Sequence, residues 1–246
     1  YGQSNVPTLV NPIAVTAGEY HTCAIDDNGV HCWGYNNNGQ TDVPTDLVNP
    51  VAVSAGSSHT CAIDDNGMHC WGLNNSGSTN YPSLVNPVAV TAGDYHTCGI
   101  DNNGVHCWGW NENDGVIYGQ TDVPTDLMNP VVITAGLLHT CAIDDNGVNC
   151  WGYSNNGETD EYGHTDYGQT NVPTNLVNPV ALSAGRHHTC AIDDNGVHCW
   201  GRNDEGEADV PTNLVNPVAV SAGAEHTCAI DDNGVRCWGK NNDGQT

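Results

Sequence analysis

One motif recurs six times along this chain, and that repetition constrains its fold more than any other feature. The motif reads A-G-x-x-H-T-C-[AG]-I-D-[DN]-N-G-[VM]-x-C-W-G. Repetition at such a period is typical of architectures in which each copy forms one structural unit and stacks on its neighbours. We therefore expect one domain over residues 1–246, built from six similar units. The six copies cover residues 17–34, 55–72, 92–109, 135–152, 184–201 and 222–239.

Each copy predicts three short antiparallel strands. Before the second copy, residues 51–55 contain two β-branched valines and follow Pro50, which fits the start of a strand. In the first copy, residues 21–25 and 30–34 flank the four-residue turn Asp-Asp-Asn-Gly at residues 26–29. Asn and Gly tolerate positive φ, so this turn is a strong hairpin signal. A fourth short strand could form in the Gln-Thr-Asp-Val segment that follows the first copy, and the sequence does not decide this.

The twelve cysteines form six pairs at C-x8-C spacing, with none left over. With a four-residue turn, Ile25 lies opposite Val30 and Cys23 lies opposite Cys32. Directly opposed strand residues have Cβ atoms about 4.5–5.5 Å apart, and the closer kind of pair is within reach of a disulfide. Such staples are typical of an oxidising compartment. The predicted disulfides are Cys23–Cys32, Cys61–Cys70, Cys98–Cys107, Cys141–Cys150, Cys190–Cys199 and Cys228–Cys237.

Metal binding is the competing interpretation, because each copy also holds histidine, such as His21 and His31. The cysteine spacing differs from the C-x2–4-C spacing of zinc sites. Neighbouring strand residues point to opposite faces, so His31 and Cys32 are poorly placed to bind one ion. Two copies replace the second histidine, by Asn149 and Arg236. We therefore expect no metal here, and a structural role for the His-Thr histidine that recurs in every copy.

Residues 17–40 resemble the regulator of chromosome condensation repeat, from the opening A-G-x-x-H-T to the closing W-G-x-N-x-x-G-Q. The resemblance covers nearly the whole chain and looks closest to a bacterial branch that includes a secreted propeller-type inhibitor of β-lactamases. It implies an all-β fold, a β-propeller with one blade of three to four short strands per repeat. The family usually has seven blades, so a closed ring of six, a missing blade and part of a longer array all stay open. We expect the tryptophan of each C-W-G to pack between blades.

The charge of the chain excludes several kinds of partner. Only four Lys and Arg stand against 29 Asp and Glu, which gives a formal net charge of −25. Such a surface repels nucleic-acid phosphates and anionic lipid, and no apolar run is long enough to span a bilayer. We therefore expect no nucleic-acid binding and no membrane insertion. The start at Tyr1 rather than Met, together with the disulfides, predicts a processed protein that is secreted, extracellular or at the cell surface.

Two loops that follow a W-G are longer than the others, at residues 110–119 and 153–168. Insertions in repeat folds map to loops that often form a binding face. Their acidic side chains suit weak Ca²⁺ binding, and no other cofactor is expected. The Asp-Asp-Asn-Gly turns are better explained by local bonds to the backbone. The candidate binding residues are Trp110, Asn111, Glu112, Asp114, Glu158, Asp160, Glu161, His164 and Asp166.

No Ser-His-Asp set, phosphate-binding loop or paired acid set stands out from the repeats, so we expect no enzyme. A Gly-Gln-[Ser/Thr] link occurs at both residues 2–4 and residues 244–246. That redundancy and the repeated surface favour a non-catalytic extracellular structural or adhesive propeller, with self-association into a polymer or surface layer. Two alternatives stay open. One is a specific protein-binding or inhibitor propeller that uses the enlarged loops, and the other is a calcium-assisted glycan-binding module.

Overall fold

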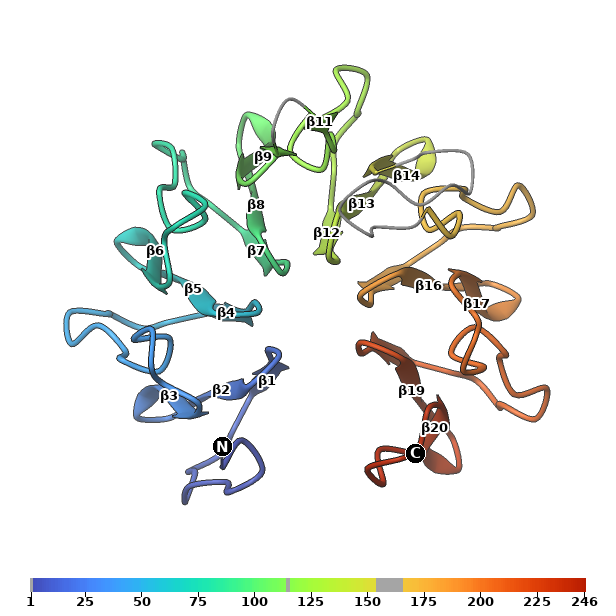
Figure 1. The fold of residues 1–246 in the computed structure, drawn as a ribbon, viewed down its shortest axis with the longest axis horizontal. Helices are drawn as coiled ribbons and strands as arrows, with labels where there is room; N and C mark the ends of the chain where they lie inside the picture. Colours follow the sequence, from blue (N-terminus) through green and yellow to red (C-terminus); the bar gives the residue numbers. More distant parts are fainter. Residues whose placement is uncertain (1, 114–115, 154–165) are drawn as a thin grey trace. The chain divides into compact units, whose positions relative to one another are not determined.

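Each of the six repeats forms one three-stranded antiparallel sheet, which is one blade (Figure 1). The computed structural model describes residues 2–113, 116–153 and 166–246. The chain forms two compact units, Tyr1–Asn113 and Asp114–Thr246, with three blades in each. The fold class predicted from the sequence is thus confirmed, whereas a single domain over the whole chain stays a prediction.

The first unit holds the first three blades. Their strands are β1 (Ala14–Ala17), β2 (His21–Asp26) and β3 (Gly29–Gly34); β4 (Ala52–Ala55), β5 (His59–Asp64) and β6 (Gly67–Gly72); and β7 (Ala89–Ala92), β8 (His96–Asp101) and β9 (Gly104–Gly109). Within this unit β4 contacts both β1 and β7, so the first strands of the three blades lie side by side (Figure 1). A short strand, β10 (Glu112–Asn113), follows in the first enlarged loop.

The second unit repeats the arrangement with the last three blades. Its strands are β11 (Val116–Ile117) in the first enlarged loop; β12 (Val132–Ala135), β13 (His139–Asp144) and β14 (Gly147–Gly152); β15 (Ala181–Ala184), β16 (His188–Asp193) and β17 (Gly196–Gly201); and β18 (Ala219–Ala222), β19 (His226–Asp231) and β20 (Gly234–Gly239). Here β15 contacts both β12 and β18.

The hairpin between β2 and β3 has the predicted register. Cys23 pairs with Cys32 and Ile25 with Val30, and all six predicted disulfides are present. The predicted four-residue turn, Asp26 to Gly29, is also present: Asp26 and Gly29 pair with each other and enclose a two-residue loop. The two strands extend by one residue each beyond the predicted ends, to Asp26 and from Gly29, and the cysteines stay opposite each other.

Acidic side chains fasten each hairpin turn to the segment that enters the blade. The carboxylate of Asp26 accepts hydrogen bonds from the backbone N–H groups of Val10, at 2.8 Å, and Asn28, at 2.7 Å. Its neighbour Asp27 accepts from the side-chain amide of Asn11 at 2.6 Å, and Asn11 itself has a positive φ of 50°. The bonds to Val10 and Asn28 are among the causes that lower the pKa of Asp26 to about 2. This is the local backbone role predicted for the turn.

The linker between blades does not form a fourth strand. Around Gln40 the chain makes a turn, in which the N–H of Asp42 donates to the carbonyl of Gly39 at 3.1 Å. The side chain of Gln40 is fully buried and accepts from the N–H of Asn38 at 3.0 Å. Gln40 therefore anchors the linker between the first two blades, and each blade has three strands rather than four.

Candidate functional site

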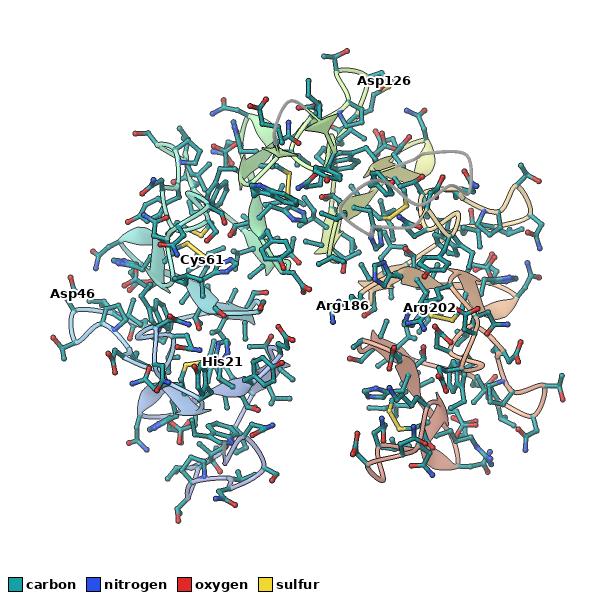
Figure 2. All side chains as sticks on the ribbon, in the orientation of Figure 1. His21, Asp46, Cys61, Asp126, Arg186 and Arg202 are labelled. Carbon is teal, nitrogen blue, oxygen red and sulfur yellow. A yellow bond between two sulfur atoms is a disulfide. The ribbon has the colours of Figure 1, made fainter. Side chains whose placement is uncertain are left out.

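One hydrogen bond recurs wherever two neighbouring blades meet within a unit. The Nε2 atom of a histidine at the start of a middle strand lies within hydrogen-bond distance of a threonine hydroxyl in the next blade. The first pair is His21 with Thr60, at 2.8 Å, and Figure 2 labels His21 in its place beside the second blade. The other described pairs are His59 with Thr97 at 2.8 Å, His139 with Thr189 at 2.9 Å and His188 with Thr227 at 2.8 Å.

The same threonine hydroxyl also donates a hydrogen bond to the backbone of the linker. Thr60 donates its O–H to the carbonyl of Gln40 at 2.8 Å, and the indole N–H of Trp71 donates to the same carbonyl at 3.0 Å. Because the hydroxyl hydrogen is used in this way, Thr60 must accept from His21, so the imidazole carries its hydrogen on Nε2. A blade junction is therefore a chain of hydrogen bonds from histidine to threonine to a linker carbonyl shared with tryptophan.

The junction histidines are neutral at neutral pH. Burial lowers the pKa of His21, His59 and His188 to about 4 and that of His96 to about 3. The Nδ1 atoms of His21 and His188 are buried, with no hydrogen-bond partner among the described residues. A second proton would thus create a buried charge and an unpaired N–H group, both of which are costly.

Glycine allows the blades to approach closely at the same place. A Cβ atom added to Gly18 would lie 2.2 Å from the carbonyl oxygen of Gly56 in the next blade, and 2.7 Å from Cε1 of His21. Gly56 meets Gly93 in the same way, at 2.4 Å. The Ala-Gly dipeptide before each histidine therefore leaves room for the neighbouring backbone and for the imidazole ring.

Apolar side chains complete the junction, as shown by the second and third blades. Trp108 of the third blade packs with Cys61, Ile63 and Met68 of the second, and Val90 of the third blade adds to this cluster. The expected packing of tryptophan between blades is thus observed here. A blade accordingly has two different sides. We call the side with histidine, the first cysteine and isoleucine the His face, and the side with threonine, tryptophan and the valine of the first strand the Thr face.

The last blade presents its His face without a described partner. The imidazole of His226 has no hydrogen bond to any residue in the described part of the chain, and Cys228 is partly exposed. Ile230 is 46% exposed, whereas its equivalent Ile63 is 2% exposed. Val235, which pairs with Ile230, is 69% exposed. This face therefore exposes the same residue positions that interior blades bury.

The first blade presents the complementary Thr face. Its Thr22 and Trp33 both donate to the carbonyl of Gln3, at 3.2 and 2.8 Å. Val15 is 73% exposed, although the equivalent Val90 packs in the interior cluster. Thr22 has no histidine partner among the residues that the structure describes. Within its own compact unit, each of these two faces therefore lacks a neighbouring blade: the Thr face on the first blade and the His face on the last.

A cationic cluster strengthens the junction between the last two blades. The Arg202 guanidinium donates to Glu225 at 2.8 Å, and Lys240 contacts the other carboxylate oxygen of Glu225. Hydrogen bonds from Lys240 and Arg202 lower the pKa of Glu225 to about 2. Three of the four cationic side chains of this acidic protein lie on the last two blades in ion pairs, namely Arg202, Arg236 and Lys240.

The candidate residues of the enlarged loops lie in several environments. Trp110 packs edge-on against Tyr95, with ring centroids 5.2 Å apart, and Glu112 is exposed in β10 after the half-buried Asn111. Asp166 is buried, and its carboxylate accepts from the N–H of Gly168 at 2.8 Å. The remaining candidates, Asp114, Glu158, Asp160, Glu161 and His164, lie outside the described residues.

Two buried tyrosines, one from each enlarged loop, contact each other through their rings. Tyr118, near the end of the first loop, lies with its ring centroid 5.4 Å from that of Tyr153, at the start of the second. Among the described residues, no three His, Cys, Asp or Glu side chains are arranged to hold a metal ion. No helix in the same part of the chain is long and apolar enough to span a membrane.

The most important junction residues did not stand out in the sequence. Thr60 lies next to a repeated cysteine, which is the more conspicuous residue. Gln40 acts through its backbone carbonyl, a group that every residue has and that the sequence therefore does not reveal. The signal that could have found them is their recurrence at fixed positions beside the histidine and in the Gly-Gln-Thr link.

The model of the Regulator of chromosome condensation (RCC1) repeat matches residues 13–40, 51–78, 88–116, 180–207 and 218–245, which is more than half of the chain. The fourth repeat, which precedes the longest loop, is outside the matched segments. No curated protein matches the chain.

Several solved structures share the fold. The ectodomain of receptor kinase CR4 from Physcomitrella patens is 26% identical with a TM-score of 0.74, and the match covers 95% of this chain and 63% of that one. This chain thus spans less than two thirds of that ectodomain. The ACR4 ectodomain of Arabidopsis thaliana is 22% identical, with a TM-score of 0.69 and coverage of 93% and 85%. Yeast RCC1 (Prp20), bound to Kap60, is 19% identical, with a TM-score of 0.73 and coverage of 94% and 70%.

Proposed function

Because this chain belongs to the RCC1 repeat family, whose propeller fold suits protein binding, we propose that it is a non-catalytic extracellular structural or adhesive protein that self-associates. The observation that carries this proposal is the complementarity of the two open faces. His226 and Ile230 on the last blade need a partner such as Thr22 and Trp33 on the first blade. A second copy of the chain supplies that partner.

The chemistry of the interior junctions supports this partner. The same residues already hold neighbouring blades together within each unit, through the His-to-Thr bond and the apolar cluster around Trp108. Burying the exposed side chains of Ile230 and Val235 against a second copy would stabilise the contact. The gain is roughly 25 cal/mol for each Å² of apolar surface removed from water. Contact between a His face and a Thr face is heterologous, so repeated contacts between copies generate either rings or open filaments.

The location is proposed from the covalent structure. Six disulfides are typical of an oxidising environment. The similar chain from Physcomitrella patens is the ectodomain of a receptor kinase. Both observations support an extracellular or cell-surface location. A role in binding protein is further supported by the yeast relative, whose structure was solved bound to Kap60.

Self-association is tested by sedimentation and electron microscopy over a range of concentrations. We expect species larger than one chain, and a His226→Ala variant in which association weakens about tenfold, the effect of losing one buried hydrogen bond of about 1.4 kcal/mol. His198→Ala is the matched control, because His198 bonds Asp193 within its own blade and should leave association unchanged. A monomer at every concentration would reject self-association.

A second candidate function is specific binding of another protein through the enlarged loops. The observation that favours it is local: only these two linkers are lengthened, and their inner ends are held by the buried pair Tyr118 and Tyr153. Replacing each loop by the short linker of the first repeat should abolish such binding without unfolding the blades. Calcium-assisted glycan binding rests on loop acids, and calorimetry that shows no heat with Ca²⁺ and no change with chelator would reject it.

A further inference from the structure

Every blade exposes two apolar side chains just before its first strand. One follows the proline of the Asn-Pro dipeptide and is 66–74% exposed in all six repeats. The other precedes the asparagine and is also exposed in all six. The six pairs are Val10 and Ile13, Val48 and Val51, Val85 and Val88, Met128 and Val131, Val177 and Val180, and Val215 and Val218.

The backbone holds both members of a pair at one end of the blade. The N–H of Val51 donates to the carbonyl of Ile63 at 2.9 Å, and the carbonyl of Val48 accepts from the N–H of Asp65 at 2.9 Å. Both valines therefore lie at the end that carries the hairpin turn. Since β4 contacts both β1 and β7, the pairs of the first unit follow one another from blade to blade. We call these six residues the apolar row: Val10, Ile13, Val48, Val51, Val85 and Val88.

Folding alone does not explain why the row is apolar. Val51 leads into β4, where a β-branched residue is favoured, but threonine suits an exposed strand position equally well. Val48 lies outside the strands and precedes Asn49, which has a positive φ of 51°. Repeated exposed apolar side chains that lie together are typical of an interaction site.

The exposure is a property of each blade rather than of the ends of the chain. The second blade has a neighbour on both sides within its unit. Its Val51 is nevertheless about as exposed as Ile13 of the first blade and Val88 of the third. The apolar row is therefore open whatever lies before the first blade or after the last.

Exposed carboxylates accompany the row. Asp65 is exposed beside Val48, and its carboxylate accepts from the side-chain amide of Asn49 at 2.6 Å. Asp27 has the same place on the first blade, and Asp46 is exposed at the outer end of the linker that leads to Val48 (Figure 2). None of the three has a cationic partner among the described residues. Residues 2–113 contain ten Asp and Glu and no Lys or Arg.

We propose that the apolar row is a docking surface for a segment of another protein that carries both apolar and basic side chains. The apolar side chains of the partner cover the valines, and its lysine or arginine side chains pair with Asp27 and Asp65. A second copy of the chain is a poor occupant, because two such rows would bring carboxylates together. The row is separate from the junctions between blades, so this proposal does not depend on self-association.

The first test measures binding of two synthetic peptides to the whole chain by calorimetry. One peptide is four copies of Val-Ser-Lys-Ser, in which valine and lysine share one face when the peptide is extended. The other is four copies of Ser-Ser-Lys-Ser, which has the same charge without the valines. We expect the valine peptide to bind at least about tenfold more tightly. Equal affinities would overturn the proposal, because charge alone would then account for binding.

A variant of the row tests where the valine peptide binds. Ile13→Thr, Val51→Thr and Val88→Thr, made together, keep the β-branched shape and the net charge of the chain. This variant should bind both peptides equally, with the affinity for the serine peptide unchanged from the parent. A preference for the valine peptide that survives in the variant would overturn the assignment to the row. Thermal unfolding checks that the blades stay folded.

Two single substitutions test the carboxylates, and each copies a residue that another repeat already carries. Asp65→Asn reproduces Asn102 of the third blade. Asp42→Asn is the matched control: it reproduces Asn80, which accepts from Asn74 just as Asp42 accepts from Asn36.

Both substitutions remove one negative charge, but only Asp65 lies beside the row. Asp65→Asn should weaken binding of the valine peptide roughly threefold, the scale of one exposed ion pair, and Asp42→Asn should weaken it clearly less. Equal losses would show that only the net charge attracts the peptide and would overturn the proposed pairing. If the parent chain binds neither peptide, the docking surface is rejected, while self-association still stands.

Discussion

The imidazole of His59 lies 2.8 Å from the hydroxyl of Thr97, although the two residues are 38 positions apart in the chain. This contact joins two blades whose strands are not otherwise hydrogen-bonded into one sheet. Its recurrence in each described junction means that the stability of the array depends on a small set of buried polar contacts between neighbours. In repeat proteins such nearest-neighbour contacts decide how strongly the units act together.

Removing one hydroxyl should measure what this contact contributes. Thr97→Val keeps the shape of the side chain, but leaves the buried N–H of His59 without its acceptor. We expect the free energy of unfolding to fall by about 1–3 kcal/mol in urea titrations. The matched control is Thr22→Val on the first blade, where no histidine partner is described, and its loss should be clearly smaller. Equal losses at both positions would contradict the role given to the histidine bond.

The junction histidines should make stability depend on pH. Burial holds the pKa of His21, His59 and His188 at about 4, against about 6.5 in the unfolded chain. At pH values between about 4 and about 6.5, these histidines are protonated in the unfolded chain but not in the folded one. The free energy of unfolding therefore falls as the pH falls from about 6.5 to about 4. Each such shift corresponds to on the order of 3 kcal/mol.

Melting temperatures measured from pH 7 to pH 5 should therefore fall steadily. A His59→Gln variant, which keeps a side-chain N–H but does not titrate, should show a shallower decline than the parent. A melting temperature that does not change over this range would contradict the assignment of neutral, buried imidazoles.

Close backbone approach should make glycine essential at interior junctions. In Gly56→Ala the new Cβ would lie 2.4 Å from the carbonyl oxygen of Gly93 and 2.6 Å from the His59 ring, so the blades must separate. We expect a loss of about 1–3 kcal/mol, as for other overpacked sites. In Gly223→Ala on the last blade, the three atoms nearest to the new Cβ all belong to the side chain of His226. This substitution should cost less in the monomer, and unfolding by denaturant compares the two.

The disulfide of the last blade should be the first to react with a reductant. Cys228 is partly exposed on the open His face, whereas its five counterparts Cys23, Cys61, Cys98, Cys141 and Cys190 are fully buried. Limited reduction followed by alkylation and mass spectrometry should label Cys228 and Cys237 first. Removing this bond should cost roughly 2.5–3 kcal/mol by the chain-entropy account. Uniform labelling of all six pairs would contradict the open face.

Within one blade, the sequence was sufficient to place the residues. The alternation of side chains along strands and a local turn put Cys23 opposite Cys32, and the structure confirms that pair. The predicted four-residue turn from Asp26 to Gly29 is confirmed as well, and its two end residues pair with each other. The sequence did not show that the carboxylate of Asp26 also accepts from the backbone N–H of Val10, because Val10 lies 16 residues away in the chain.

Between blades, the sequence showed that His21 recurs but not what it binds. Its partner Thr60 is 39 residues away, and no periodicity within one copy relates them. The role of Gln40 was still harder to foresee, because a carbonyl group is common to every residue. The open faces could not be predicted either, since the residues of the last blade match those of the interior blades and differ only in what covers them.

The placement of the disulfides has a mechanical consequence. Each one closes a hairpin inside a single blade, and none of the six links one blade to another. Under tension, the junctions between blades would therefore yield before the hairpins. When a blade is pulled away from its neighbour, its linker and its first strand would unfold and extend. The hairpin closed by the disulfide would stay folded. Extension would then occur in short, reversible steps, and every released blade would retain the template for docking again.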